Sequence, residues 1–288
     1  MKTELLVNFE NYHLVGIGDF THGINETWEY RLDVIKNIIK QGISIVIYNE
    51  DTQYSIDNIY GDKDLSINYK THPTKKTDSF PHGPMNRYCH IVYDSPIYLK
   101  IIKFIRKHRD KIALVAVDSD VIARDKVMAE KILDHMKKTA RDKVIRFFWA
   151  HNAHVAPRPI TELYELKYAP RETHRCGWYL RKTLGSSYCV ILSTGYKGTL
   201  RFSISCDNEQ CTDKKYYKTP YFKLFCHSQY EELDSKNKWK LTENKSFPKK
   251  LVEYAGAEFP DGYFLRDHLD CDYILFFPRV SGLSLLTP

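Results

Sequence analysis

Residues 14–23 read LVGIGDFTHG, an apolar run that leads directly into a polar, glycine-flanked turn. A short apolar run bounded by turn residues is typical of a buried strand. The turn after it carries two ionisable side chains, Asp19 and His22. In open α/β sheets, ligands bind outside the carboxyl ends of the strands. The stretch therefore predicts both a strand of a parallel sheet and one wall of a functional crevice.

A second stretch repeats this arrangement more than a hundred residues later. Residues 144–155 read VIRFFWAHNAHV, so His151 and His154 follow another apolar run. Because the carboxyl ends of parallel strands meet at one edge, we expect the two segments to line the same crevice. Histidines and a carboxylate in one crevice suit general acid–base chemistry, and they suit metal binding almost as well.

The rest of the chain alternates strand-like runs with helical periods, which indicates an α/β fold with a mostly parallel sheet flanked by helices. Strands are expected at 14–18, 44–48, 113–117, 144–149, 188–193, 199–205 and 272–277, and helices at 25–40, from Ser95-Pro96 onward, at 122–138 and at 174–184. Residues 206–250 are polar and poorly periodic, and we expect surface excursions there. No linker divides the sequence, so residues 1–288 are predicted to form one domain.

Residues 51–93 differ from their surroundings, because they are polar and aromatic with no sustained period. Long loops in compact domains are usually functional or disordered. We therefore predict a lid or loop insertion between the second and third strands.

Composition narrows the class of protein. The 288 residues are 43% hydrophobic and 27% charged, and no apolar run approaches the length of a membrane span. The seven cysteines form no Cys-x-x-Cys pair, and the first residues lack the apolar stretch of a secretion signal. These features predict a cytoplasmic protein with free thiols and no membrane partner. The net charge of +7 comes from scattered lysines rather than a basic stripe, which argues against nucleic acid.

Several motifs in one order resemble the erythromycin esterase family. The GDFTHG and WAHNAHV segments resemble the family's Gly-Glu-x-Thr-His-Gly loop and Trp-Ala-His-Asn-x-His strand end. Further similarity lies at 124–130, at 177–181 with 198–202, and in the closing strand at 272–280. The resemblance implies a hydrolytic enzyme with an α/β fold that acts on a small-molecule ester, macrolactones included. It leaves the substrate open, because the family carries a longer helical insertion where this chain has residues 51–93.

His22 is the leading candidate for catalysis. A histidine in a turn at a strand end can present its imidazole to a crevice as a general base, although a turn or capping role is the alternative. In the family, the matching histidine is thought to activate the attacking water. Asp19 could orient the imidazole. The family has glutamate at this place, so the shorter aspartate is a departure that puts full activity in question.

The resemblance adds other candidates. Arg31 matches an arginine of the family's active site, where it would bind a substrate oxygen or stabilise an oxyanion. Either Asn49 or Glu50 stands opposite a family acid at the end of the second strand. If Asn49 is the match, a carboxylate has been lost.

His151 and His154 could be a base and an electrophile, two metal ligands, or hydrogen-bonded core histidines. Asp118 and Glu130 are weaker candidates. Arg124, Asp125 and Glu130 can equally be interpreted as a structural salt-bridge network.

Three functional hypotheses follow. No Gly-x-Ser-x-Gly elbow, Walker loop or dinucleotide fingerprint occurs, and no local sequence supports a nucleophilic cysteine, which favours direct attack by an activated water over an acyl-enzyme. The alternative enzyme is a hydrolase that uses a divalent metal, bound by donors from the set Asp19, His22, Glu50, His151 and His154. The third hypothesis is an inactive relative that binds a ligand or a protein partner.

Overall fold

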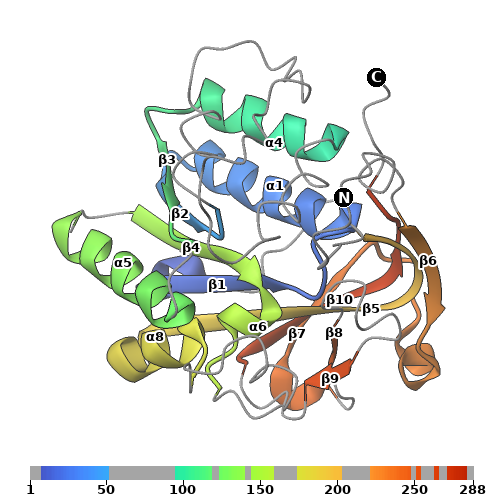
Figure 1. Cartoon of the computed structure of the whole chain (residues 1–288). Coiled ribbons are helices and arrows are strands. Elements are labelled where there is room, and N and C mark those ends of the chain that lie inside the picture. The colour runs from blue at the N-terminus through green and yellow to red at the C-terminus, as the bar shows by residue number, and fades with distance from the viewer. Residues whose placement is uncertain are drawn as a thin grey trace, which may run out of the picture.

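The computed structural model describes residues 8–51, 95–118, 123–139, 144–158, 174–202, 221–247, 251–253, 263–265 and 271–283. An eight-stranded sheet runs through the centre of this part of the chain, in the order β3-β2-β4-β1-β5-β10-β7, with β6 paired to β5 (Figure 1). The parallel strands are β1 (Leu14–Asp19), β2 (Ser44–Asn49), β3 (Ile112–Ala116), β4 (Val144–His151), β5 (Tyr188–Phe202) and β10 (Tyr273–Val280). This confirms the predicted α/β class with a mostly parallel sheet.

The remaining strands are antiparallel to their neighbours. β6 (Tyr221–Cys226) pairs with β5, β7 (Lys240–Glu243) pairs with β10, and β8 (Leu251–Glu253) with β9 (Tyr263–Leu265) forms a separate ribbon. The prediction of surface excursions over residues 206–250 is therefore wrong for β6 and β7. β7 is only four residues long and β6 has an irregular pattern, so neither sequence indicates that these strands extend the main sheet at its edges.

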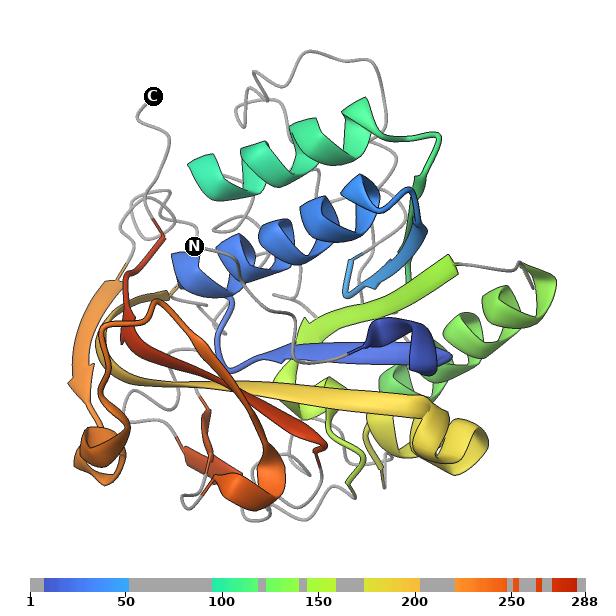
Figure 2. The same cartoon turned by 180° about the vertical axis from the view of Figure 1, so that it is seen from behind.

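Helices cover both faces of the sheet. α1 (Asn25–Lys40) and α4 (Pro96–Lys107) pack together on one face, and α5 (Arg124–Lys138) and α8 (Cys176–Leu184) pack together on the other (Figures 1 and 2). A short helix, α6 (Asn152–Val155), follows β4. In the described residues, 3-10 turns occupy Phe9–Asn11, Gly185–Ser187, Ser228–Leu233 and Asn244–Ser246.

Local sequence explains several of these boundaries. α1 begins and ends where its helical period predicts, and its apolar stripe, including Leu32 and Ile35, is buried. The predicted Ser95-Pro96 start is confirmed, since the Ser95 hydroxyl accepts a hydrogen bond from the Tyr98 N–H and Pro96 is the first helical residue. β1 is buried along its whole length, as expected for a central parallel strand.

One strand differs from the prediction. β5 runs unbroken from Tyr188 to Phe202, where the sequence predicted two strands separated at residues 194–198. The segment between the two predicted strands pairs with β10 and then with β6. Gly198 has a φ of 144°, a backbone conformation that glycine adopts more readily than other residues. Backbone pairing on both edges therefore outweighs the low strand propensity of glycine.

Two further predictions concern the insertion and membrane spans. The insertion at 51–93 lies outside the described residues, apart from Asp51. Among the described residues, no helix is both long and apolar enough to cross a bilayer.

Candidate active site

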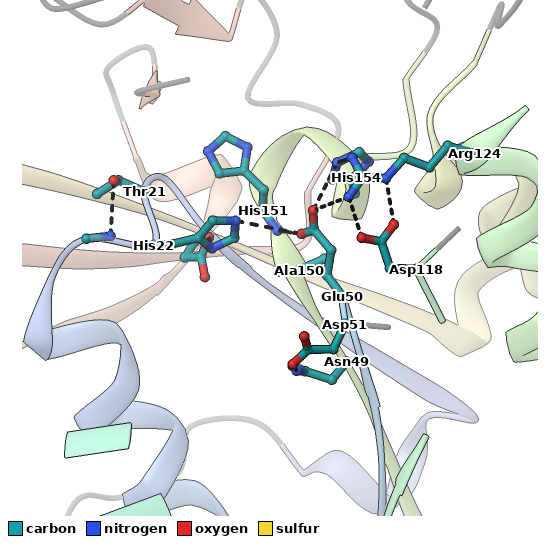
Figure 3. Close-up of polar contacts among 12 residues, drawn as sticks. Thr21, His22, Asn49, Glu50, Asp51, Asp118, Arg124, Ala150, His151 and His154 are labelled. Carbon is teal, nitrogen blue, oxygen red and sulfur yellow. Dashed lines mark hydrogen bonds and ion pairs between the residues drawn. The ribbon is translucent and has the colours of Figure 1, made fainter. Parts of the chain in front are cut away.

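Three strand ends bring the candidate residues together. β1 and β4 pair in parallel with Asp19 beside His151, and β4 pairs with β2 so that Asn49 lies beside Trp149. Parallel pairing places the carboxyl ends of these strands at one edge of the sheet. Asp19, Glu50 and His151 therefore leave the sheet side by side, and the two histidine segments border one site as expected (Figure 3).

Asp19 and His22 form the first carboxylate–imidazole pair of this site. His22 Nδ1 lies 3.0 Å from Asp19 Oδ1, and the imidazole side chain is 31% exposed whereas Asp19 is fully buried. The turn that carries His22 is fixed at its backbone: Trp28 Nε1 donates to the His22 carbonyl, and the Gly23 N–H donates to Thr21 Oγ1. Nδ1 is thus directed toward Asp19, and Nε2 lies on the side of Glu50.

Gly23 allows this turn to pack tightly. A Cβ atom on Gly23 would lie 1.8 Å from the carbonyl oxygen of Arg201 on β5. The Gly23 carbonyl also accepts the N–H groups of Arg201 and Leu283. The absence of a side chain therefore lets the His22 turn lie against the sheet.

Arg31 lies behind this pair rather than in the open part of the site. Its Nη1 is 2.9 Å from Asp19 Oδ2, and its Nη2 donates to the carbonyl oxygens of Ile17 and Ala150. The arginine is only 1% exposed. The expected contact between Arg31 and a substrate oxygen therefore has no support here, because the guanidinium faces Asp19 and backbone carbonyls. We assign Arg31 a positioning role instead.

The charges around Asp19 keep it ionised. Burial alone would raise the pKa of Asp19, but His22 and then Arg31 outweigh it, so the pKa lies below its ordinary value. A buried carboxylate beside an imidazole favours the tautomer with its proton on Nδ1. Nε2 of His22 is then free to accept a proton.

Glu50 is the central carboxylate of the site (Figure 3). Its Oε2 accepts the main-chain N–H of His151 at 2.8 Å and lies 3.9 Å from His22 Nε2. Its Oε1 lies 3.3 Å from His154 Nε2 and accepts from Arg124 Nη2 at 2.8 Å. Burial alone would raise the pKa of Glu50. His154 and Arg124 lower this pKa by more than burial raises it, so Glu50 is ionised.

The side chain of Asn49 makes different contacts from that of Glu50, because neighbouring side chains along a strand point to opposite faces. Its amide donates to Asp51 Oδ2 at 2.7 Å. Of the two residues that could stand opposite the family acid, Glu50 is the one whose side chain contacts the histidines.

A second carboxylate–imidazole pair lies on the other side of Glu50. His154 Nδ1 is 2.7 Å from Asp125 Oδ1, and both side chains are at most 8% exposed. Asp125 also accepts the Cys176 N–H and contacts Arg175 Nη1. Burial would raise the pKa of Asp125, but His154 and Arg175 lower it. Both ring nitrogens of His154 are therefore engaged.

His151 completes the set of histidines. Its ring packs edge-on against the ring of His22, with centroids 5.4 Å apart. The structure thus brings together Asp19, His22, Glu50, His151 and His154, and it places Arg31 beneath them.

Sequence reasoning underestimated the residues around α5. Arg124 binds Asp118 through Nε at 2.6 Å and Glu50 through Nη2, so one guanidinium joins two strand-end acids. Arg175 had no local signal at all, because only the docking of α8 on α5 brings it to Asp125. Glu130, by contrast, is 57% exposed, and its Oε1 lies 3.8 Å from Lys126 Nζ.

The donors expected for a divalent metal fit such an ion poorly. Asp19 already faces Arg31, and Glu50 already faces Arg124. Two guanidinium cations in the cluster would repel a divalent ion. Within the part of the chain that is described, no three His, Cys, Asp or Glu side chains are grouped to hold a metal.

Comparison with known proteins supports the sequence resemblance. Residues 103–212 match the sequence model of the erythromycin esterase family, and this range includes Arg124, Asp125, His151 and His154. The chain is also similar to a solved succinoglycan biosynthesis protein, with a TM-score of 0.67, 13% identity, and coverage of 96% of this chain and 90% of the other.

Two further solved structures share the fold. A mutant of the erythromycin esterase EreC in its open conformation gives a TM-score of 0.57 at 11% identity, covering 97% of this chain and 94% of the other. A Bacillus cereus protein gives a TM-score of 0.56 at 11% identity, covering 99% and 93%. No curated protein sequence matches the chain.

Proposed function

Because the chain is erythromycin esterase-like, we propose that it is a hydrolase in which His22 activates a water molecule for attack on an ester carbonyl. One observation carries this proposal. The Nδ1 atom of His22 faces the buried Asp19 at 3.0 Å, while Nε2 lies 3.9 Å from Glu50 and the imidazole side chain is 31% exposed. This arrangement is that of a general base held in one tautomer by a carboxylate.

The proposed reaction balances with one water and one ester. Nε2 of His22 takes a proton from water, and the resulting hydroxide adds to the carbonyl carbon. The tetrahedral intermediate then collapses, the bond to the leaving alkoxide breaks, and the alkoxide takes a proton. The products are a carboxylic acid and an alcohol, and a macrolactone ring would be opened.

The neighbouring histidines differ in their suitability for the last step. His154 is 8% exposed and is held through Nδ1 by Asp125 and through Nε2 by Arg124 and Glu50. His151 lies beside the His22 ring, at the end of β4. We therefore assign the donation of a proton to the alkoxide either to His151 or to His22, which holds the proton taken from water. His154 is assigned a positioning role.

Glu50 has a separate electrostatic role. Its carboxylate lies 3.9 Å from His22 Nε2, where a negative charge favours the imidazolium that forms during proton transfer. Arg124 holds Glu50 in this position at 2.8 Å. The carboxylates of the Asp19–Arg31 and Glu50–Arg124 pairs thus both favour the imidazolium form of His22.

The test is a hydrolysis screen by mass spectrometry, with macrolides and simple esters as substrates. Wild type, His22→Gln and the control His108→Gln, at the C-terminal end of α4, are compared, each with and without chelator. A substrate that gains one water with wild type and the control, but not with His22→Gln, supports the proposal. Turnover that His22→Gln leaves unchanged contradicts it.

The same screen separates the other two hypotheses. Turnover that chelator abolishes and zinc or manganese restores would favour the metal-dependent hydrolase. A ligand that binds tightly to wild type and is never converted would favour an inactive binding protein.

A further inference from the structure

The two histidine segments are joined by a side chain that replaces missing strand pairing. β1 and β5 pair in parallel from Leu14 beside Tyr188 to Ile17 beside Ile191, and the pairing stops there. Beyond this point, β5 continues along β10, while the β1 chain turns away toward His22. Among the described strands, none pairs with the edge of β5 that faces β1 at Ser193.

Asn152 fills this place. Its Nδ2 donates to the Ser193 carbonyl at 2.8 Å, and its Oδ1 accepts the Ser193 N–H at 3.0 Å. The amide thus makes the two hydrogen bonds that a neighbouring strand would make. Asn152 and Ser193 are both fully buried, where unpaired backbone groups would be costly.

Gly18 gives the amide its path across β1. A Cβ atom on Gly18 would lie 2.5 Å from Asn152 Oδ1 and 3.0 Å from Asn152 Cα. Asn152 can therefore reach β5 only because the residue it crosses has no side chain. Both Gly18 and Asn152 belong to the segments that carry the histidines.

Ser193 extends the connection to the base itself. Its hydroxyl accepts the Phe20 N–H at 3.0 Å, and Phe20 lies between Asp19 and His22 in the sequence. One buried chain of hydrogen bonds therefore runs from the residue after His151, through Ser193, to the turn that carries His22.

We propose that Asn152 and Ser193 are positioning residues that set the His22 turn against the β4 end, and that Ser193 maintains the Asp19–His22 contact through Phe20. This inference rests on the proposed function for its kinetic consequence, but not for its structural one. Misplacing a catalytic group by about 1 Å can cost about 10²-fold in rate.

The test uses Ser193→Ala, which removes only the hydroxyl and keeps the backbone groups that Asn152 binds. Its matched control is Thr194→Val, which also removes a buried hydroxyl from β5 but on the opposite face, where Thr194 contacts Tyr230. If Ser193→Ala does not fold, Ser193→Cys keeps the volume of the side chain and supplies a weaker acceptor.

The first readout needs no substrate. In ¹⁵N-labelled protein, the Nδ1 proton of His22, assigned by its loss in His22→Gln, reports the 3.0 Å contact with Asp19. We expect this signal to move or to disappear through exchange with water in the Ser193 variants, and to persist in Thr194→Val. An unchanged signal in Ser193→Ala, an equal change in Thr194→Val, or no such signal in wild type overturns the proposal.

The second readout is kinetic, with any ester that the protein hydrolyses. We expect kcat to fall about 10- to 100-fold in Ser193→Ala with little change in KM, because the displaced group acts in the chemical step. A rise in KM with an unchanged kcat contradicts a positioning role. If no ester is hydrolysed but Ser193→Ala alters the His22 signal, the hydrolase proposal fails and the positioning role stands.

Discussion

Asp19 and Arg31 form a buried ion pair directly behind His22, with Asp19 Oδ2 2.9 Å from Arg31 Nη1 and neither side chain more than 1% exposed. The guanidinium also lies over the rings of Trp28 and Trp149, at 4.7 and 5.4 Å from their centroids. Arg31 therefore does two things from beneath the site. It keeps Asp19 ionised next to the imidazole, and it ties α1 to the ends of β1 and β4 through backbone carbonyls.

The first prediction concerns the charge of Asp19. Asp19→Asn keeps the size of the side chain but removes the carboxylate that fixes the His22 tautomer, so kcat should fall by up to about 10⁴-fold. It also leaves Arg31 buried without a counter-ion, so we expect a loss of about 3–5 kcal/mol in unfolding free energy. Steady-state kinetics and urea unfolding measure the two effects. Asp134→Asn, at a 64% exposed position, is the control, and equal effects in both variants would contradict the prediction.

The second prediction concerns the length of the same acid. The family has glutamate here, yet Asp19 already reaches both His22 and Arg31 at hydrogen-bonding distance. An extra methylene in this fully buried position should cost about 1–3 kcal/mol through overpacking and should not raise kcat. Thermal unfolding and kinetics of Asp19→Glu test this. A variant that is more active than wild type and equally stable would show that aspartate limits the site.

The strand and helix pattern of the sheet could be predicted because it depends on local periodicity. β1, α1 and the helix start at Ser95 follow from apolar spacing and capping residues within a few positions. β5 and β6 could not, since glycines in one and an irregular pattern in the other carry less weight than pairing with distant strands.

The candidate site divides in the same way. Asp19, His22, His151 and His154 stand out because they follow apolar runs, and strand ends of a parallel sheet meet at one edge. The partners that orient them come from elsewhere in the chain. Nothing in the local sequence of Arg175 or Ser193 indicates that these residues lie within hydrogen-bonding distance of Asp125 and Phe20.

The third prediction is a dependence of stability on pH. The pKa of Asp125 is lowered on folding, since His154 and Arg175 outweigh its burial. A carboxylate with a lowered pKa stabilises the folded state above its ordinary value of 3.8, and this contribution is lost as the pH falls through the lower folded pKa. Asp125→Asn should therefore be less stable than wild type at pH 7, and the difference should shrink below about pH 4.

Urea unfolding from pH 2.5 to 7 measures this difference. The exposed variant Asp134→Asn should differ little from wild type across the range. A deficit in Asp125→Asn that stays constant down to the lowest pH would show that packing, rather than charge, explains the role of Asp125.

The last prediction concerns Arg124, whose planar guanidinium contacts Glu50 through Nη2 and Asp118 through both Nε and Nη2. Lysine presents one ammonium and cannot hold two carboxylates in this fixed geometry. Arg124→Lys should therefore release Glu50 from its place near His22 and lower kcat by about 10-fold or more, while the net charge is preserved.

The control is Lys126→Arg, the reverse change two residues along α5 at a 55% exposed position, which should leave kcat unchanged. Because both variants keep the same net charge, a loss confined to Arg124→Lys would reflect geometry and not the electrostatic field of the helix. Full activity in Arg124→Lys would instead mean that the His151 N–H and His154 hold Glu50 well enough without the guanidinium.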